Sequence, residues 1–300
     1  MVTPIPYIRE FEFSYGVATP ISPNVRRLVA NNPGRFSGWG TNVYIIGTDE
    51  LIVVDPGPNT DRHFEVLTQA IGTAKVMAVF VTHHHLDHSP MAPRLAAHFD
   101  CQTHGFGPPN TMLDGGGVRL EAGDDVGFSP QVRVKDGQIF TGNGWELHCV
   151  HTPGHTSNHM CYAVQPDNGL ICGDHVMAWS TSVVSPPDGS MSDYLHSLTK
   201  VQNMNFAHLW PGHGSAIDDP HPFLSAYLEH RAERDRQILL QLRGGIGQIK
   251  SMVPDMYAQV DKRLHPAACH SVLSHLIRMI ETGQVTCHGT PGINSEYRLI

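Results

Sequence analysis

One run of residues, His83-His84-His85-Leu86-Asp87-His88, constrains this chain more than any other feature. A β-rich segment at 76–81 precedes it and helical spacing over 91–99 follows it, so the run lies on a loop after a predicted strand. Neutral imidazole and carboxylate groups are ligands that divalent ions such as zinc accept. On a tight loop, His83 and His85 can face one ion while Asp87 and His88 turn toward another. The run therefore predicts half of a metal site.

Three further candidate ligands stand at the ends of strand-like runs, and a glycine immediately precedes each of them. They are His155, Asp174 and His213. Glycine permits the tight turn that aims the next side chain into a cleft at the edge of a sheet. We expect these three side chains to close around the histidine run, because the run alone cannot surround two ions.

The order of the predicted elements favours sheets flanked by helices, an α/β architecture. Strands are predicted at 42–46, 51–54, 76–81, 131–134, 146–150, 160–164, 170–172 and 208–211, and helices at 62–71, 91–99 and 194–204. Two irregular segments, 105–117 and 180–192, are long enough to be functional loops.

The pattern changes after Pro220, where we divide the chain into a catalytic domain (1–220) and a second domain (221–300). A long amphipathic helix over 223–242 ends at Gly244-Gly245. Helices at 251–260 and 266–282 and a hairpin from 284–286 to 297–299 complete the order of a winged helix. Such a unit binds nucleic acid or protein. The alternative is a helical cap that packs on the catalytic domain or on a second copy in a homodimer.

Charge and cysteine usage narrow the class of protein. The chain has 20 Lys+Arg against 28 Asp+Glu, a net charge of −8, which argues against binding nucleic acid by bulk electrostatics alone. The second domain, with 9 basic and 7 acidic side chains, is only weakly basic. Six cysteines without a CxxC pair indicate free thiols in a reducing compartment, so we expect a cytoplasmic protein. No segment resembles a signal peptide or a membrane span.

The ordered ligand pattern resembles the metallo-β-lactamase superfamily, whose pattern is HxHxDH, a lone His, an Asp and a lone His. Within it, the chain looks most like the β-lactamase-like protein 2 group, which also has a winged-helix tail. The resemblance implies an αββα sandwich with two metal ions. It implies that His83, His85 and His155 hold the first ion, that Asp87, His88 and His213 hold the second, and that Asp174 bridges them.

The opening hairpin strengthens the resemblance through Gly40-Thr41-Asn42-Val43-Tyr44 and Asp55-Pro56-Gly57. Asp55 is expected to support a ligand from behind. Two departures leave the ligands intact. Ser89-Pro90-Met91 stands where many relatives have Ser-Gly-Gly, and His175 follows the bridging aspartate at a variable position.

The resemblance implies a hydrolase in which two divalent ions activate a bridging hydroxide as the nucleophile. Zinc is the expected ion, and iron or manganese also suits this ligand set. We assign catalytic roles to Asp87 and Asp174, which place the ions. His175 is a candidate for protonating the leaving group or contacting substrate, and the alternative is that it orients a ligand.

Two substrate classes remain open. The first is a phosphodiester, cut by an endoribonuclease-like enzyme whose winged helix guides single-stranded nucleic acid. The second is a small-molecule thioester, lactone or ester, as in glyoxalase II, and the acidic charge favours it. A binding protein without turnover is a third reading, which the intact ligand set opposes.

The remaining histidines and cysteines near the run are expected to be structural. His84 points away from the ions in this interpretation, and His151 and His159 support or pack rather than bind. Cys161 and Cys172, in apolar strand-like runs, are expected to be buried and inert.

Overall fold

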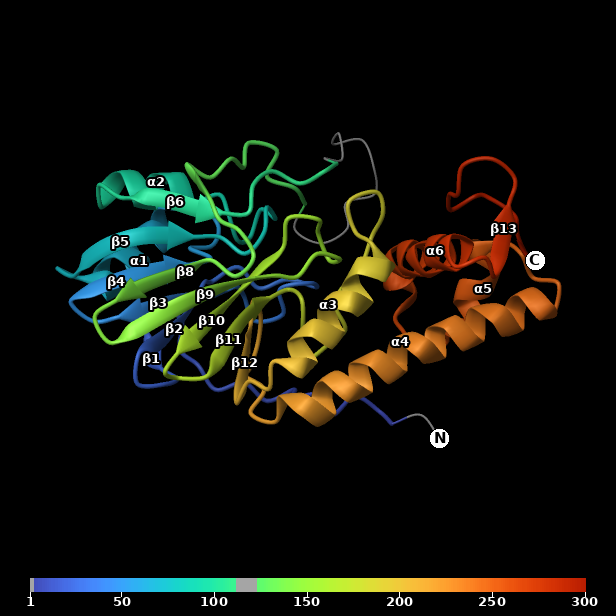
Figure 1. The fold of residues 1–300 in the computed structure, drawn as a ribbon, viewed down its shortest axis with the longest axis horizontal. Coiled ribbons are helices and arrows are strands. Elements are labelled where there is room, and N and C mark those ends of the chain that lie inside the picture. The colour runs from blue at the N-terminus through green and yellow to red at the C-terminus, as the bar shows by residue number, and fades with distance from the viewer. Residues whose placement is uncertain (1–2, 112–122) are drawn as a thin grey trace.

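Two β-sheets face each other in the computed structural model, which describes residues 3–111 and 123–300 (Figure 1). The seven-stranded sheet has the order β1-β2-β3-β4-β5-β6-β7, and the five-stranded sheet has the order β12-β11-β10-β9-β8. The first sheet contains β1 (Thr19–Pro20), β2 (Val25–Val29), β3 (Asn42–Gly47), β4 (Glu50–Val54), β5 (Lys75–Phe80), β6 (Gln102–Gly105) and β7 (Val132–Arg133). The second contains β8 (Ile139–Gly142), β9 (Trp145–His151), β10 (Met160–Gln165), β11 (Gly169–Gly173) and β12 (His208–Pro211).

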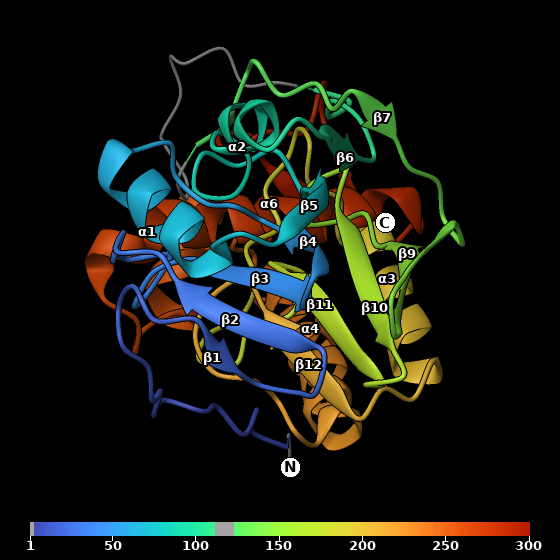
Figure 2. The ribbon, with the colours of Figure 1, turned by 90° about the vertical axis from the view of Figure 1, so that its left-hand side faces the viewer.

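Helices cover the outer face of each sheet, which makes four layers (Figures 1 and 2). Helices α1 (Asp61–Ile71) and α2 (Ala92–His98) share a core with the outer face of the first sheet. Helices α3 (Met191–Asn203) and α4 (Pro220–Arg243) share another with the second sheet. A third core fills the space between the sheets. The expected αββα sandwich is confirmed.

Strand β3 shows why the sequence folds into this sandwich. Its side chains alternate between the two sides of the sheet, as the two-residue period of a strand requires. Tyr44 and Ile46 pack in the core between the sheets, and Val43 and Ile45 pack under the helices. A strand buried on both faces reads as an unbroken apolar run, which is what these four residues are.

Every predicted strand and helix is present, with bounds that differ by a few residues, but four strands were not predicted. These are β1, β2, β6 and β8. Strand β2 has the sequence VRRLV, in which two arginines interrupt the apolar pattern of a buried strand. Arg27 is nevertheless buried, because its guanidinium lies over the Phe11 ring, 4.4 Å from the ring centroid.

The C-terminal part has its own core, built around α5 (Ile249–Met256), α6 (His265–Glu281) and the hairpin of β13 (Val285–Cys287) and β14 (Tyr297–Leu299). The predicted winged-helix order is confirmed. In the part of the chain that the structure describes, no helix combines the length and apolar character that a membrane span needs.

Helix α4 belongs to two cores. Phe223 and Tyr227, near its start, pack in the core beneath the second sheet. Ile238 and Leu242, near its end, pack in the core of the C-terminal part. The division predicted at Pro220 therefore falls at the start of a helix that both parts share.

The C-terminal part also packs against the catalytic part through polar contacts. Ser185 Oγ lies 3.1 Å from His270 Nδ1, and Ser192 Oγ donates to Glu281 Oε2 at 2.6 Å. These contacts lie within one chain. They favour the reading of the second domain as a cap on the catalytic domain.

Candidate metal centre

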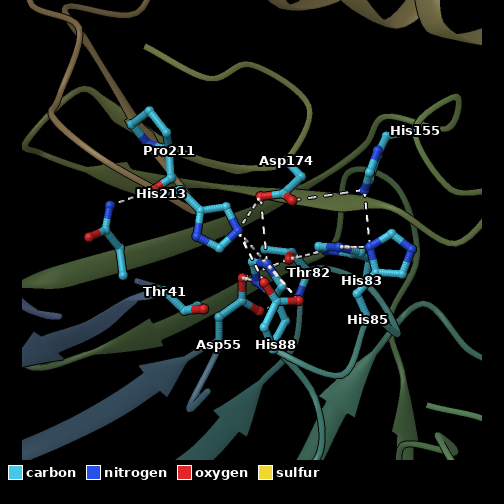
Figure 3. Close-up of polar contacts among 12 residues, drawn as sticks. Thr41, Asp55, Thr82, His83, His85, His88, His155, Asp174, Pro211 and His213 are labelled. Atoms are coloured by element: carbon cyan, nitrogen blue, oxygen red, sulfur yellow. Dashed lines mark hydrogen bonds and ion pairs between the residues drawn. The ribbon is translucent and has the colours of Figure 1, made fainter. Parts of the chain in front are cut away.

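The predicted ligand side chains meet at one edge of the two sheets (Figure 3). The histidine run follows β5, and His155, Asp174 and His213 follow β9, β11 and β12. Strands β9, β11 and β12 run in the same direction, because β10 is antiparallel to β9 and β11, and β11 pairs with β12 in parallel. An isolated bridge between Thr41 and His213 ties this edge to the start of β3. The expected convergence is confirmed.

The first cluster contains His83, His85, His155 and Asp174, all buried. His85 Nδ1 lies 3.0 Å from His83 Nε2 and 3.3 Å from His155 Nε2. His155 Nε2 lies 4.0 Å from Asp174 Oδ2. Three imidazole nitrogens and one carboxylate oxygen thus surround one point.

The second cluster contains Asp87, His88 and His213. His88 Nε2 and His213 Nε2 are 3.3 Å apart. The Asp87 carboxylate lies 3.3 Å from His213 Nε2 through Oδ2 and 3.7 Å from His88 Nε2 through Oδ1.

Asp174 lies between the clusters (Figure 3). Its Oδ2 faces His155, while its Oδ1 lies 3.6 Å from His88 Nε2 and 3.5 Å from His213 Nε2. Each carboxylate oxygen therefore faces a different cluster. The side chain is placed where a group shared by two cations would have to be.

Asp55 fixes the imidazoles at the base of the site. Its Oδ2 accepts hydrogen bonds from His88 Nδ1 at 2.8 Å and from Thr82 Oγ1 at 2.7 Å. Because the Thr82 hydroxyl donates to Asp55, it accepts from His83 Nδ1, 2.9 Å away. The predicted supporting role of Asp55 is confirmed. The role of Thr82 was not predicted, since a threonine at a strand end has no distinguishing pattern.

Backbone carbonyls fix two more of the facing imidazoles. His155 Nδ1 donates to Val183 O at 2.7 Å, and His213 Nδ1 donates to Gly40 O at 3.0 Å. A histidine that donates through one nitrogen directs the lone pair of the other toward the site.

The donor set fits divalent cations. Imidazole nitrogens that face one another at 3.0–3.3 Å repel unless a proton or a cation lies between them. Three nitrogens with a carboxylate, and two nitrogens with two carboxylates, are sets that zinc, iron and manganese accept.

The two clusters differ in how they bind protons. Burial, together with neighbouring imidazoles, lowers the pKa of His83 well below its usual value. Burial would also lower the pKa of His88, but the carboxylates of Asp87, Asp174 and Asp55 outweigh it and raise this pKa to about 9. Protonation is therefore favoured at His88 in the second cluster and disfavoured at His83 in the first.

His175 lies fully buried beside the site. Its ring packs against Tyr194, with centroids 5.3 Å apart, and burial lowers its pKa to about 3. Among the described residues, neither ring nitrogen has a hydrogen-bond partner. A neutral, enclosed imidazole is poorly placed to protonate a leaving group. The alternative, that His175 orients a ligand, stays a prediction, because neither ring nitrogen bonds a proposed ligand among the described residues.

The other nearby histidines support the site as expected. His159 Nε2 accepts from the Asp174 amide at 3.2 Å, and His151 stacks on Phe106 with ring centroids 3.9 Å apart. Burial raises the pKa of Cys161 to about 12, in agreement with the expected inert thiol. All six cysteines are free. Of the loop predicted at 105–117, residues 112–117 lie outside the described residues.

Two family models match the chain. The metallo-beta-lactamase superfamily model covers residues 37–213, and the beta-lactamase associated winged helix domain model covers residues 249–292. The first match contains all the predicted ligands. The second covers α5, α6 and β13.

Similar proteins span most of the chain. The "Beta-lactamase-like protein 2 homolog" of Drosophila melanogaster is 30% identical over 89% of this chain and 91% of that protein. The "Atrochrysone carboxyl ACP thioesterase" of Aspergillus fumigatus is 30% identical over 74% of this chain and 66% of that protein. A crystal structure of a beta-lactamase domain protein from Burkholderia ambifaria shares the fold, with a TM-score of 0.78 at 19% identity over 97% of this chain and 96% of that one. The chain therefore belongs to the metallo-β-lactamase superfamily of hydrolases and has a β-lactamase-associated winged helix domain.

Proposed function

We propose that this protein is a binuclear, metal-dependent hydrolase that cleaves thioesters of small acyl substrates. The observation that carries the proposal is the pair of clusters joined through the two carboxylate oxygens of Asp174. In this proposal His83, His85 and His155 hold the first ion, Asp87, His88 and His213 hold the second, and Asp174 is shared. Zinc is the ion we propose first, and iron and manganese suit the same donors.

Divalent ions held at these positions supply Lewis acidity, which polarises a carbonyl oxygen and lowers the pKa of water. The protein supplies orientation. Asp55 and the Gly40 and Val183 carbonyls hold three imidazoles in place before substrate arrives, so little reorganisation accompanies the reaction. The carboxylates of Asp87 and Asp174 offset positive charge in a buried setting, where electrostatic interactions are strong.

The C-terminal domain gives little support to a nucleic-acid substrate. Several of its basic side chains are paired with carboxylates of the same domain. The pairs are Arg278 with Asp235, Arg236 with Glu233, and Arg263 with Asp261. A nucleic-acid surface needs a stripe of basic groups that are free to meet phosphates. The net charge of −8 also argues against a nucleic-acid substrate.

An apolar surface beside the second cluster supports an acyl substrate. Trp39 and Trp179 meet edge to face, with ring centroids 6.0 Å apart, and both are partly exposed. They pack around Gly214, the residue after His213. Aromatic rings offer an acyl group an apolar wall close to the proposed ions. The relative named as an ACP thioesterase also supports the choice of a thioester.

A substrate panel tests the proposed function. The full chain, stripped of metal and reloaded with zinc, is assayed on acyl-pantetheine thioesters, bis(4-nitrophenyl) phosphate and single-stranded RNA. We expect kcat/KM for a thioester to exceed that for the phosphodiesters by at least about a hundredfold. Metal-free protein is the control and is expected to be inactive. Cleavage of RNA with the thioesters left intact would reject the proposal in favour of a phosphodiesterase.

We also predict that uptake of the second ion depends more strongly on pH than uptake of the first. Because the pKa of His88 is raised to about 9 in the absence of metal, an ion must displace protons from the second cluster at neutral pH. The pKa of His83 is lowered, so the first cluster has no such competitor. Raising the pH from 6 to 8 should strengthen uptake of the second ion more than uptake of the first in calorimetry. Equal pH dependence of both steps would contradict the prediction.

A further inference from the structure

The second nitrogen of His85 faces a carboxylate that no motif indicated. His85 Nδ1 lies among the facing atoms of the first cluster, and its Nε2 lies 3.7 Å from Asp124 Oδ1. Four other imidazoles of the site are fixed by Asp55, Thr82 or a backbone carbonyl. Asp124 occupies the corresponding place behind His85.

The backbone brings Asp124 to this place. His85 and Asp124 form an isolated antiparallel bridge. On either side of it, Leu86 N donates to Gly123 O at 2.9 Å, and Asp125 N donates to His84 O at 2.8 Å. The segment 123–125 is therefore paired with the histidine run itself, and the position of the carboxylate follows from this pairing.

His84 lies on the other side of the Asp124 side chain. His84 Nε2 lies 3.3 Å from Asp124 Oδ1, and its Nδ1 lies 3.1 Å from Asn158 Oδ1. Asn158 in turn donates through Nδ2 to Gly107 O at 2.8 Å, which fixes the direction of its amide. His84 is 1% exposed. It points away from the facing atoms, as expected, and its Nε2 has no hydrogen-bond partner among the described residues.

We propose that Asp124, placed by the backbone pairing of its segment with the histidine run, is a positioning residue that fixes the ring of His85 and strengthens binding of the first ion. When Nδ1 of His85 is committed to a cation, its Nε2 carries the proton and faces the Asp124 carboxylate. Such a carboxylate orients the ring and makes its coordinating nitrogen a better donor. The inference rests on the proposed role of His85 as a ligand.

Cobalt binding tests this inference without reference to substrate. Cobalt(II) alone is titrated into the metal-free full chain against a competing chelator, and the visible absorption of each bound ion is recorded. Asp124→Ala is compared with wild type, and Asp125→Asn serves as the matched control, because Asp125 Oδ2 bonds Ser89 instead. We expect Asp124→Ala to weaken binding of the first cobalt by about 10–100-fold and to change its absorption spectrum.

Two further variants make the result specific. Asp124→Asn keeps the side-chain volume and an acceptor oxygen but loses the charge. We therefore expect it to lose less affinity for the first cobalt than Asp124→Ala does. If Asp124→Ala does not fold, the Asp124→Asn variant tests the positioning role in its place. His84→Ala keeps the backbone pairing that places Asp124, so we expect it to weaken binding of the first cobalt less than Asp124→Ala does.

Three outcomes separate this inference from the proposed function. Affinity and spectrum of Asp124→Ala equal to those of Asp125→Asn would overturn the positioning role. Three cobalt ions in wild type, with one lost in Asp124→Ala, would overturn it too, because Asp124 would then be a ligand. A wild-type chain that binds no cobalt would overturn the proposed metal centre itself.

Discussion

An Asp174→Ala variant is expected to lose thioester hydrolysis by roughly a thousandfold and to retain fewer than two tightly bound ions per chain. The two carboxylate oxygens of Asp174 face different clusters, so this one substitution removes a donor from each cluster. It also removes negative charge that offsets two cations in a buried setting. Metal content after dialysis and steady-state kinetics measure both effects.

Asp174→Asn and Asp136→Asn are the companions to this variant. Asp174→Asn preserves the shape of the side chain and tests whether its negative charge is needed for metal binding and activity. The second removes a carboxylate that pairs with Lys200 outside the site, so it should leave activity and metal content unchanged. Circular dichroism of the metal-free proteins shows whether each one folds. Full turnover with two retained ions in both Asp174 variants would reject the two-ion mechanism.

Gly212→Ala is expected to remove the second ion and to lower activity about a hundredfold, although no proposed ligand is itself substituted. A Cβ at this position would lie 2.4 Å from Asp174 Oδ1 and 2.8 Å from His88 Cε1. Asp55 fixes the His88 ring through a hydrogen bond, so the methyl group must displace the Asp174 carboxylate, the His88 ring or both. Metal content, together with kcat/KM for a thioester, measures the effect.

Gly127→Ala is the matched control for this substitution. Its Cβ would meet Asp125 Oδ1 at 3.5 Å, an ordinary contact, and neither glycine has a left-handed φ. The comparison therefore isolates the clash inside the site from general effects of adding a methyl group. Two tightly bound ions in Gly212→Ala would show that the site can expand, and the prediction would be wrong.

The histidine run and the glycines before His155, Asp174 and His213 were sufficient to predict which side chains meet. Each of these signals is local, because a strand end and a tight turn place the side chain from a few neighbouring residues. Asp55 could be predicted for the same reason, through the turn Asp55-Pro56-Gly57 and the resemblance to a family.

The supports of the site could not be predicted, because they come from distant parts of the chain. Asp124 reaches His85 through strand-like pairing between segments far apart in sequence, and Asn158 reaches His84 through a hydrogen bond between their side chains. Val183 and Gly40 act through backbone carbonyls, whose positions no side-chain pattern reveals. Strand β2 was not predicted because one of its two arginines, Arg27, is buried against an aromatic ring.

The helix α4 that enters both cores has a consequence for how such a protein can change during evolution. The segment after Arg243 can diverge or be exchanged while Phe223 and Tyr227 still complete the core beneath the second sheet. A break before Pro220 would strip these side chains from that core and expose apolar surface. Because Ile238 and Leu242 of α4 pack in the core of the C-terminal part, a replacement winged helix must also cover these two side chains, which limits the domains that can be joined to this hydrolase.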